Sequence, residues 1–169
     1  EPGDKVFPYL QQNLDDVITV DDDELVACFL DMVENHKMVV ENSGLLTVAA
    51  AKHLPAEGKR VVSILSGGNM DVITMSSVVQ NGLIQRGRIF TVSVLLPDRP
   101  GMLVRVANVI AEQNGNVIKL EHNQFVSTNR QAAVELRVTI EAYGESHKAQ
   151  IVGALDAAGF KPETVQTSL

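Results

Sequence analysis

The amino-acid sequence predicts an α/β protein of two units: a partial parallel-sheet α/β unit, followed by a ferredoxin-like βαββαβ domain. Three observations support this prediction. Short apolar runs alternate with amphipathic, helix-like stretches along the 169 residues. Charge is uneven, since residues 1–87 hold 13 acidic and 6 Lys or Arg side chains, whereas residues 88–169 hold 8 of each. The hydrophobic pattern also changes after residues 84–88, so we expect domains at 1–87 and 88–169.

The first unit is expected to hold two strands and three helices. In chain order these are a strand at 15–20, a helix after Asp21, a helix within 39–54, a strand at 60–65 and a helix at 70–83. Asp21 and Glu24 have the spacing of a capping box. The run 60–65 is almost continuously apolar, which is typical of a strand buried on both faces of a parallel sheet. Two strands cannot complete such a sheet and the chain begins with Glu1, so we expect a piece of a longer protein.

The second unit has the order βαββαβ, which is the ferredoxin-like plan. Strands are expected at 89–97, 116–122, 133–142 and 160–165, helices at 102–114 and 145–159, and a turn at 126–131. The first helix would direct Leu103, Val106, Ala107 and Ile110 inward, and the third strand Val134, Leu136, Val138 and Ile140. Pro162 predicts that the last strand lies at an edge, because proline cannot donate to a neighbouring strand.

Composition excludes several classes of function. The chain has no basic patch and few aromatic residues, so we expect no nucleic-acid partner. It has no apolar run of the ~20 residues that span a bilayer and no signal peptide, so we expect no membrane partner. Its single cysteine, Cys28, fits a cytoplasmic protein. The four histidines lack ligand-like spacing, so no metal site is expected.

The stretch SILSGGNMD, residues 63–71, is the first candidate for a site. Ser66 follows a predicted strand, and ligands of open α/β sheets gather at the carboxyl ends of strands. Gly67 and Gly68 allow a ring to approach closely. A serine hydroxyl can bond a heteroaromatic nitrogen without protonating it, and for a pyridine cofactor this favours elimination over transamination. The same spacing also fits a plain strand–turn–helix connection.

The second candidate is the stretch LLPDRPGML, residues 95–103. Pro100 fixes a turn, and Gly101 opens space at the start of a predicted helix. Free backbone N–H groups at that point can receive a carboxylate. A tight turn between a strand and a helix explains the same residues without a ligand.

Together these residues resemble a known family. EPGDKVFPYLQQNLDDVITVDDDEL, VVENSGLLTVAAAKHL and VVSILSGGNMD resemble the end of the catalytic domain of threonine ammonia-lyase (threonine dehydratase), a pyridoxal-phosphate enzyme of the tryptophan-synthase-β fold type. SVLLPDRPGMLVRVANVIAEQNGNVIKLEHNQ resembles the ACT regulatory domain that follows it. One short ACT domain resembles the catabolic branch of the family.

The resemblance implies roles for particular residues. Ser66 would contact the pyridine nitrogen, with Glu41 near the cofactor ring and Gly67, Gly68 and Asn69 shaping the wall. The effector loop would comprise Asp98, Pro100, Gly101 and Met102, and the facing strand Asn116, Val117 and Ile118, usually from a neighbouring chain. The stretch ENSGLL, residues 41–46, departs from the glycine- and alanine-rich run of the family.

The resemblance also implies an activity for the parent protein. It would convert L-threonine to 2-oxobutanoate and ammonia with pyridoxal 5′-phosphate, and an amino-acid effector would act on a homo-oligomer, a dimer or a tetramer. The family's Schiff-base lysine and phosphate loop lie upstream of this segment, so the chain alone is expected to be inactive. Two alternatives stay open: a serine dehydratase or serine racemase of the same fold, and a non-enzymatic amino-acid-sensing ACT module.

Overall fold

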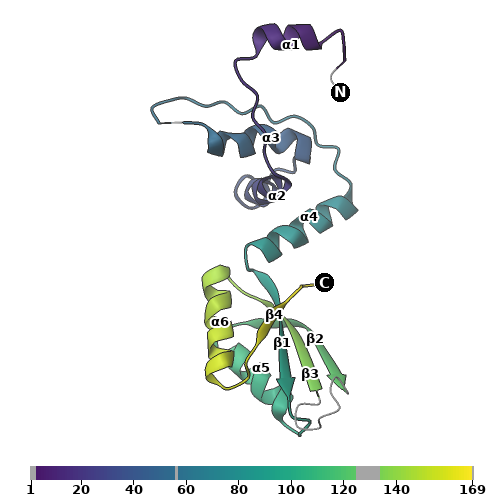
Figure 1. Cartoon of the computed structure of the whole chain (residues 1–169), viewed down its shortest axis with the longest axis vertical. Helices are drawn as coiled ribbons and strands as arrows, with labels where there is room; N and C mark the ends of the chain where they lie inside the picture. Colours follow the sequence, from purple (N-terminus) through teal and green to yellow (C-terminus); the bar gives the residue numbers. More distant parts are fainter. Residues whose placement is uncertain (1–2, 56, 125–133, 169) are drawn as a thin grey trace. The chain divides into compact units, whose positions relative to one another are not determined.

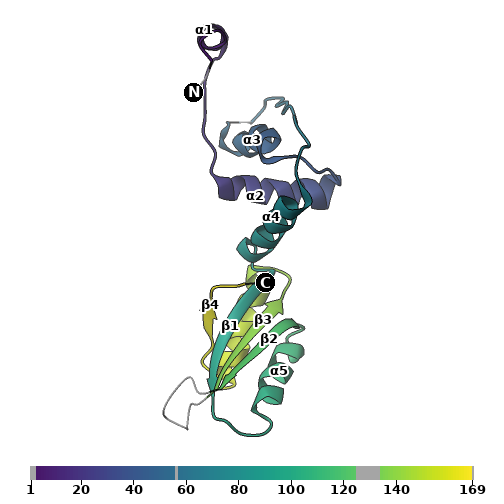
Figure 2. The same cartoon turned by 90° about the vertical axis from the view of Figure 1, so that its right-hand side faces the viewer.

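A computed structural model describes residues 3–55, 57–124 and 134–168 of the chain. The chain divides into two compact units, Glu1–Val78 and Val79–Leu169, which are described separately. Figure 1 and Figure 2 give two views of the elements in each unit. None of the described helices is both long and apolar enough to cross a membrane.

The first unit is helical in its described residues. Its elements are α1 (Phe7–Asn13), α2 (Asp22–Asp31), a π-helical turn η1 (Met32–His36), α3 (Asn42–Ala50), a 3₁₀ turn η2 (Ala51–His53) and the start of α4 (Val72–Gln85). The core lies between α2 and α3, where Phe29 and Leu45 are fully buried. At the start of α2 the Asp21 N–H donates to Glu24 Oε2 at 3.0 Å, as the capping-box spacing predicts. This bond is the main cause of the lowered pKa of Glu24.

The two strands expected in this unit are absent from its described residues. Residues 15–20 and 60–65 run without regular secondary structure. Their apolar side chains are largely in solvent, with Val17 75%, Val62 87% and Ile64 74% exposed. A strand is stabilised by hydrogen bonds to a neighbour, and no described residue of this unit supplies that neighbour. The prediction of a partial parallel sheet is therefore wrong for these segments as this chain folds.

The second unit has the predicted ferredoxin-like order. Its elements are β1 (Ile89–Leu96), α5 (Met102–Glu112), β2 (Asn116–Gln124), β3 (Val134–Glu141), α6 (Glu145–Ala157) and β4 (Glu163–Val165). The strands form one antiparallel sheet in the order β2–β3–β1–β4 (Figure 1). The strand β4 lies at an edge directly after Pro162, as that residue predicts. The expected turn at 126–131 lies outside the described residues.

Helices α5 and α6 pack on one face of this sheet. The core joins alternate residues of β1 and β3 to Val106 and Ile110 of α5 and to Ile151 and Leu155 of α6, all four fully buried. The predicted inward face of β3 is confirmed, since Val134, Leu136, Val138 and Ile140 are all buried. Leu103 was expected inside but is 39% exposed. It lies in the first turn of α5, before the helix packs against the sheet.

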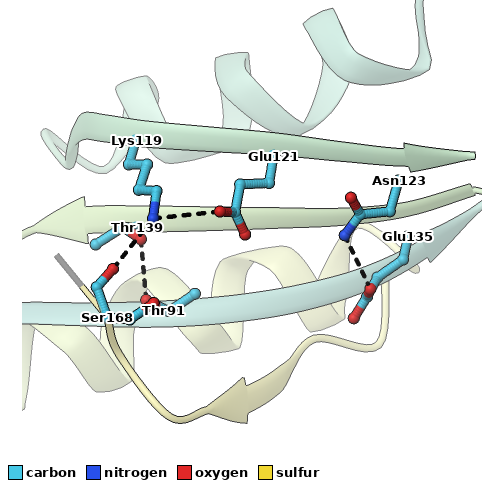
Figure 3. A network of polar contacts seen from close by, with 7 residues as sticks. All are labelled: Thr91, Lys119, Glu121, Asn123, Glu135, Thr139 and Ser168. Atoms are coloured by element: carbon cyan, nitrogen blue, oxygen red, sulfur yellow. Dashed lines mark hydrogen bonds and ion pairs between the residues drawn. The ribbon is translucent and has the colours of Figure 1, made fainter.

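The other face of the sheet is polar (Figure 3). The hydroxyls of Thr91 and Thr139 lie 3.0 Å apart and are buried. The Lys119 Nζ lies 3.2 Å from Glu121 Oε1 and donates to the Ser168 carbonyl at 3.3 Å. The residues after β4 therefore lie against this face.

Candidate functional site

The residues expected to form a cofactor wall lie together in the first unit. Glu41 is the N-cap residue of α3. Its Oε2 accepts a hydrogen bond from the Asn69 N–H at 3.0 Å, and its Oε1 accepts one from the Ser43 hydroxyl at 2.6 Å. The Glu41 N–H points to the Gly67 carbonyl at 3.5 Å. Two segments far apart in sequence, around 41 and around 67, thus form one cluster.

The cluster presents one hydroxyl next to open space. Ser66 is exposed, and within the part of the chain that the structure describes its hydroxyl has no hydrogen-bond partner. Gly67 has φ +84°, a left-handed conformation that side chains disfavour. A Cβ on Gly68 would meet no atom within 4 Å. These residues fit the edge and face of a planar heteroaromatic ring, with Ser66 able to donate to a ring nitrogen.

A depression of about 320 Å³ lies beside this cluster. It is lined by Glu41, Asn42, Ser43, Asn69, Met70, Asp71 and Thr74. Asp71 was not predicted as a site residue. Its Oδ1 accepts the N–H groups of Ile73 and Thr74 at 3.0 and 2.9 Å, and the Thr74 hydroxyl donates to Oδ2. The hydroxyl bond is the main cause of the lowered pKa of Asp71, so this carboxylate acts as the N-terminal cap of α4. The Asp-x-x-Thr spacing is the sequence signal for this cap.

The expected effector loop forms a second site, in the other unit. The turn after β1 ends at Gly101, whose φ is +88°, and α5 begins at Met102. No side chain of a described residue caps α5. A cavity of about 360 Å³ lies there, lined by Leu96, Pro97, Asp98, Arg99, Pro100, Gly101, Met102, Leu103, His122 and Val134. All four predicted loop residues line it. Uncapped N–H groups at the start of an 11-residue helix can receive a carboxylate inside this cavity.

The expected facing strand does not reach this cavity within one chain. Asn116 is paired with Glu141 at the beginning of β1, and its Nδ2 donates to Glu141 Oε2 at 3.0 Å. The loop instead follows Leu96, at the other end of β1. Leu96 is seven residues from Ile89, which corresponds to about 23 Å at about 3.3 Å per residue. Asn116 lines a smaller, polar cavity of about 200 Å³. Ile118 lies at a register shift of β2 and is 43% exposed.

Two polar lining residues of the larger cavity were missed. Arg99 lies inside the DRPG motif but was not given a role, and it brings a positive charge next to Asp98. His122 comes from β2, where it pairs with Leu136. The position of His122 follows from strand register, for which the local sequence has no signal. Among the described residues, no group of three or more His, Cys, Asp or Glu side chains could hold a metal ion.

Comparison with known proteins identifies the second unit. Residues 90–160 match the ACT domain family. The chain is 30% identical to the L-threonine ammonia-lyase of Thermotoga maritima over 166 residues. This match covers 98% of this chain and 41% of the Thermotoga protein. It is 31% identical to the L-threonine ammonia-lyase of Geobacter sulfurreducens, over 95% of this chain and 40% of that protein.

A biosynthetic protein is also similar. The biosynthetic L-threonine dehydratase IlvA of Haemophilus influenzae is 34% identical over 95% of this chain and 31% of its own length. Among solved structures, prephenate dehydratase from Streptococcus mutans matches with a TM-score of 0.39 at 18% identity, over 45% of this chain and 40% of that chain. The chain spans about two fifths of the length of the first two ammonia-lyases. Residues 90–160 thus match the ACT domain family, and the chain is similar to threonine ammonia-lyases along nearly its whole length.

Proposed function

We propose that this chain is part of a pyridoxal-phosphate-dependent threonine ammonia-lyase, which converts L-threonine to 2-oxobutanoate and ammonia. In this proposal residues 1–87 are the last part of the catalytic domain and residues 88–169 are its ACT regulatory domain. The observation that carries the proposal is the cluster of Glu41 with residues 66–69, in a chain similar to L-threonine ammonia-lyase over 98% of its length. When bound, pyridoxal phosphate supplies the electron sink for loss of the α-proton and the β-hydroxyl.

The chain's own residues would bind and orient the pyridine ring. The Ser66 hydroxyl donates a neutral hydrogen bond to the ring nitrogen, and so leaves that nitrogen unprotonated. Gly68 keeps the space next to it free of side chains, whereas Gly67 leaves room for the Glu41 carboxylate. Glu41 is engaged by Asn69 and Ser43, so its role is to hold the loop. The lysine that carries the cofactor would come from outside this chain, which alone should be inactive.

The ACT unit would bind a small amino acid at the loop 97–103. The effector's carboxylate would accept N–H groups at the start of α5, with Arg99 contributing positive charge. Most of the remaining lining side chains are apolar, which suits an apolar effector side chain.

The site would be completed by a second copy of the chain. The edge strand β2 has a free side in the described residues and leaves Ile118 exposed. A two-fold axis beside β2 would carry Asn116, Val117 and Ile118 of one copy towards the loop of the other, because antiparallel pairing brings opposite ends together. We therefore propose a homo-oligomer built on an ACT dimer.

Turnover of L-threonine by the full-length protein tests this proposal. We expect 2-oxobutanoate formation, and weaker cofactor binding or a lower kcat for Ser66→Ala, by about 1–3 kcal/mol for one lost hydrogen bond. Ser66→Asp should protonate the ring nitrogen and change the ratio of products. Activity on L-serine but not L-threonine would favour the serine dehydratase or racemase alternative. If neither substrate reacts but the ACT unit binds an amino acid, the protein is a sensing module.

Two further features belong to the same proposal. The relatives include both ammonia-lyases and biosynthetic dehydratases. We propose the catabolic type, because the short form of the ACT segment matched at residues 90–160 resembles that branch. We also propose a cytoplasmic protein, which agrees with a single, buried cysteine, Cys28.

A further inference from the structure

The segment that ends in the Ser66 loop runs along helix α3. The Thr47 hydroxyl of α3 donates to the Ile64 carbonyl at 3.0 Å, and the Ser63 hydroxyl donates to the Thr47 carbonyl at 3.3 Å. These two bonds connect the middle of the helix to residues 63–64. The segment has no strand partner among the described residues. Its hydrogen bonds to α3 therefore replace the sheet hydrogen bonds that the sequence predicted.

One turn closer to its N-terminus, the helix touches Ser66 directly. Gly44 is buried, and a Cβ placed on it would overlap the Ser66 carbonyl oxygen and lie 2.9 Å from the carbonyl carbon. The same Cβ would lie 2.7 Å from Val40 Cγ1. Any side chain at position 44 would therefore force the backbone at Ser66 to move. The Gly44 backbone is helical, a conformation that any residue can adopt. Glycine is therefore needed here because there is no room for a side chain.

At the N-terminal end of α3, the N-cap residue Glu41 contacts Gly67 and Asn69 of the same loop. Its carboxylate accepts the Asn69 N–H, and a Cβ on Gly67 would overlap Oε1 and lie 2.8 Å from the Glu41 Cγ. The two segments therefore interlock, with a glycine on each side of the contact. Positions 41, 44 and 47 are three residues apart and share one face of α3. Successive residues on that face contact residues 69 to 63 in reverse order.

We propose that this face of α3 is the template that sets the position of Ser66, and that Gly44 and Glu41 are positioning residues for it. The consequence for the cofactor depends on the proposed function, whereas the geometry of the template does not. The inference also gives ENSGLL, residues 41–46, a physical meaning: Glu41 bonds to Asn69, and Gly44 lies against Ser66.

The geometry is tested on the 169-residue chain by the backbone amide NMR shifts of residues 66–69. Gly44→Ala should move these shifts strongly, and Thr47→Val should move those of residues 63–65. Gly153→Ala is the matched control, because a Cβ there meets no atom within 4 Å, and it should leave the loop shifts unchanged. If Gly44→Ala folds with the loop shifts of the wild type, the template is refuted. If Gly44→Ala does not fold, Glu41→Ala decides: it must move the Gly67 and Asn69 shifts, and Glu41→Gln, which keeps an acceptor oxygen, must largely restore them.

The consequence is tested by cofactor affinity in the full-length protein. Ser66→Ala and Gly44→Ala should each raise the Kd for pyridoxal phosphate on the order of tenfold. The double variant should be little worse than either single variant, because both remove the same contact. Fully additive losses would refute the positioning role. If Ser66→Ala leaves the Kd unchanged while the loop shifts move as expected, the proposed function fails and the template remains.

Discussion

Replacing Gly101 by alanine or by aspartate distinguishes the effect of charge from the effect of backbone strain in the proposed effector loop. Gly101 has φ +88° and ψ −12°, and a Cβ there meets no atom within 4 Å. The Cβ of alanine or aspartate would thus meet no described atom, but either residue would adopt a left-handed conformation at a cost of about 1–2 kcal/mol. A domain of typical stability, about 5–15 kcal/mol, stays folded under that cost.

Gly101→Asp adds a negative charge next to the proposed carboxylate position. Two like charges about 4 Å apart repel by about 1 kcal/mol in water and about 4 kcal/mol near a protein surface. Effector affinity should therefore fall by about 5-fold to 1000-fold for Gly101→Asp beyond any change for Gly101→Ala. Raising the salt concentration should reduce this difference if the residue acts through charge.

Isothermal calorimetry with isoleucine, valine, threonine and serine measures this difference. Thermal unfolding of both variants should give the same midpoint within a few degrees, which controls for loss of the fold. Equal affinities of Gly101→Ala and Gly101→Asp would refute the placement of a carboxylate at this loop. Failure of the wild type to bind any of these amino acids at millimolar concentration would refute the effector site itself.

Three other perturbations have expected outcomes. Leu155→Ala, at a fully buried position, should lower the unfolding free energy by about 2–5 kcal/mol in urea titrations, whereas Leu120→Ala, 38% exposed, should change it by about 0.5 kcal/mol or less. Glu135→Gln should destabilise the second unit near pH 7, and progressively less as the pH falls below 4.5: hydrogen bonds from Arg137 and Ser93 lower the pKa of Glu135, so their stabilisation is complete above the usual value of 4.5 and is lost as the pH falls through the depressed value. An effect that stays constant as the pH falls would contradict this. The 169-residue chain mixed with pyridoxal phosphate and L-threonine should form 2-oxobutanoate no faster than free cofactor, and faster formation would mean that a lysine of this chain is catalytic.

The sequence predicted the second unit well because its elements are specified locally. The alternation of Val134, Leu136, Val138 and Ile140 determines which face of β3 is buried, and all four are buried. Pro162 correctly indicated an edge strand. Leu103 was misplaced because helical periodicity cannot show where a helix first meets the sheet.

The first unit was predicted less well because its segments depend on distant neighbours. The apolar run 60–65 has the composition of a buried strand, but α3 contacts replace the sheet that would make it one. The close approach of Gly44 to Ser66 is a contact across 22 positions, and glycine alone does not reveal its partner. Likewise, His122 reaches the cavity at the loop 97–103 through strand register, which no local pattern specifies.

The central claim is that this chain joins a cofactor wall to an effector domain in one enzyme. The most direct measurement is the initial rate of 2-oxobutanoate formation from L-threonine by the full-length protein, over a range of effector amino-acid concentrations. The account predicts turnover that changes with at least one amino acid, and a response that is lost in Gly101→Asp. Absence of threonine turnover, or an identical response in wild type and Gly101→Asp, would contradict it.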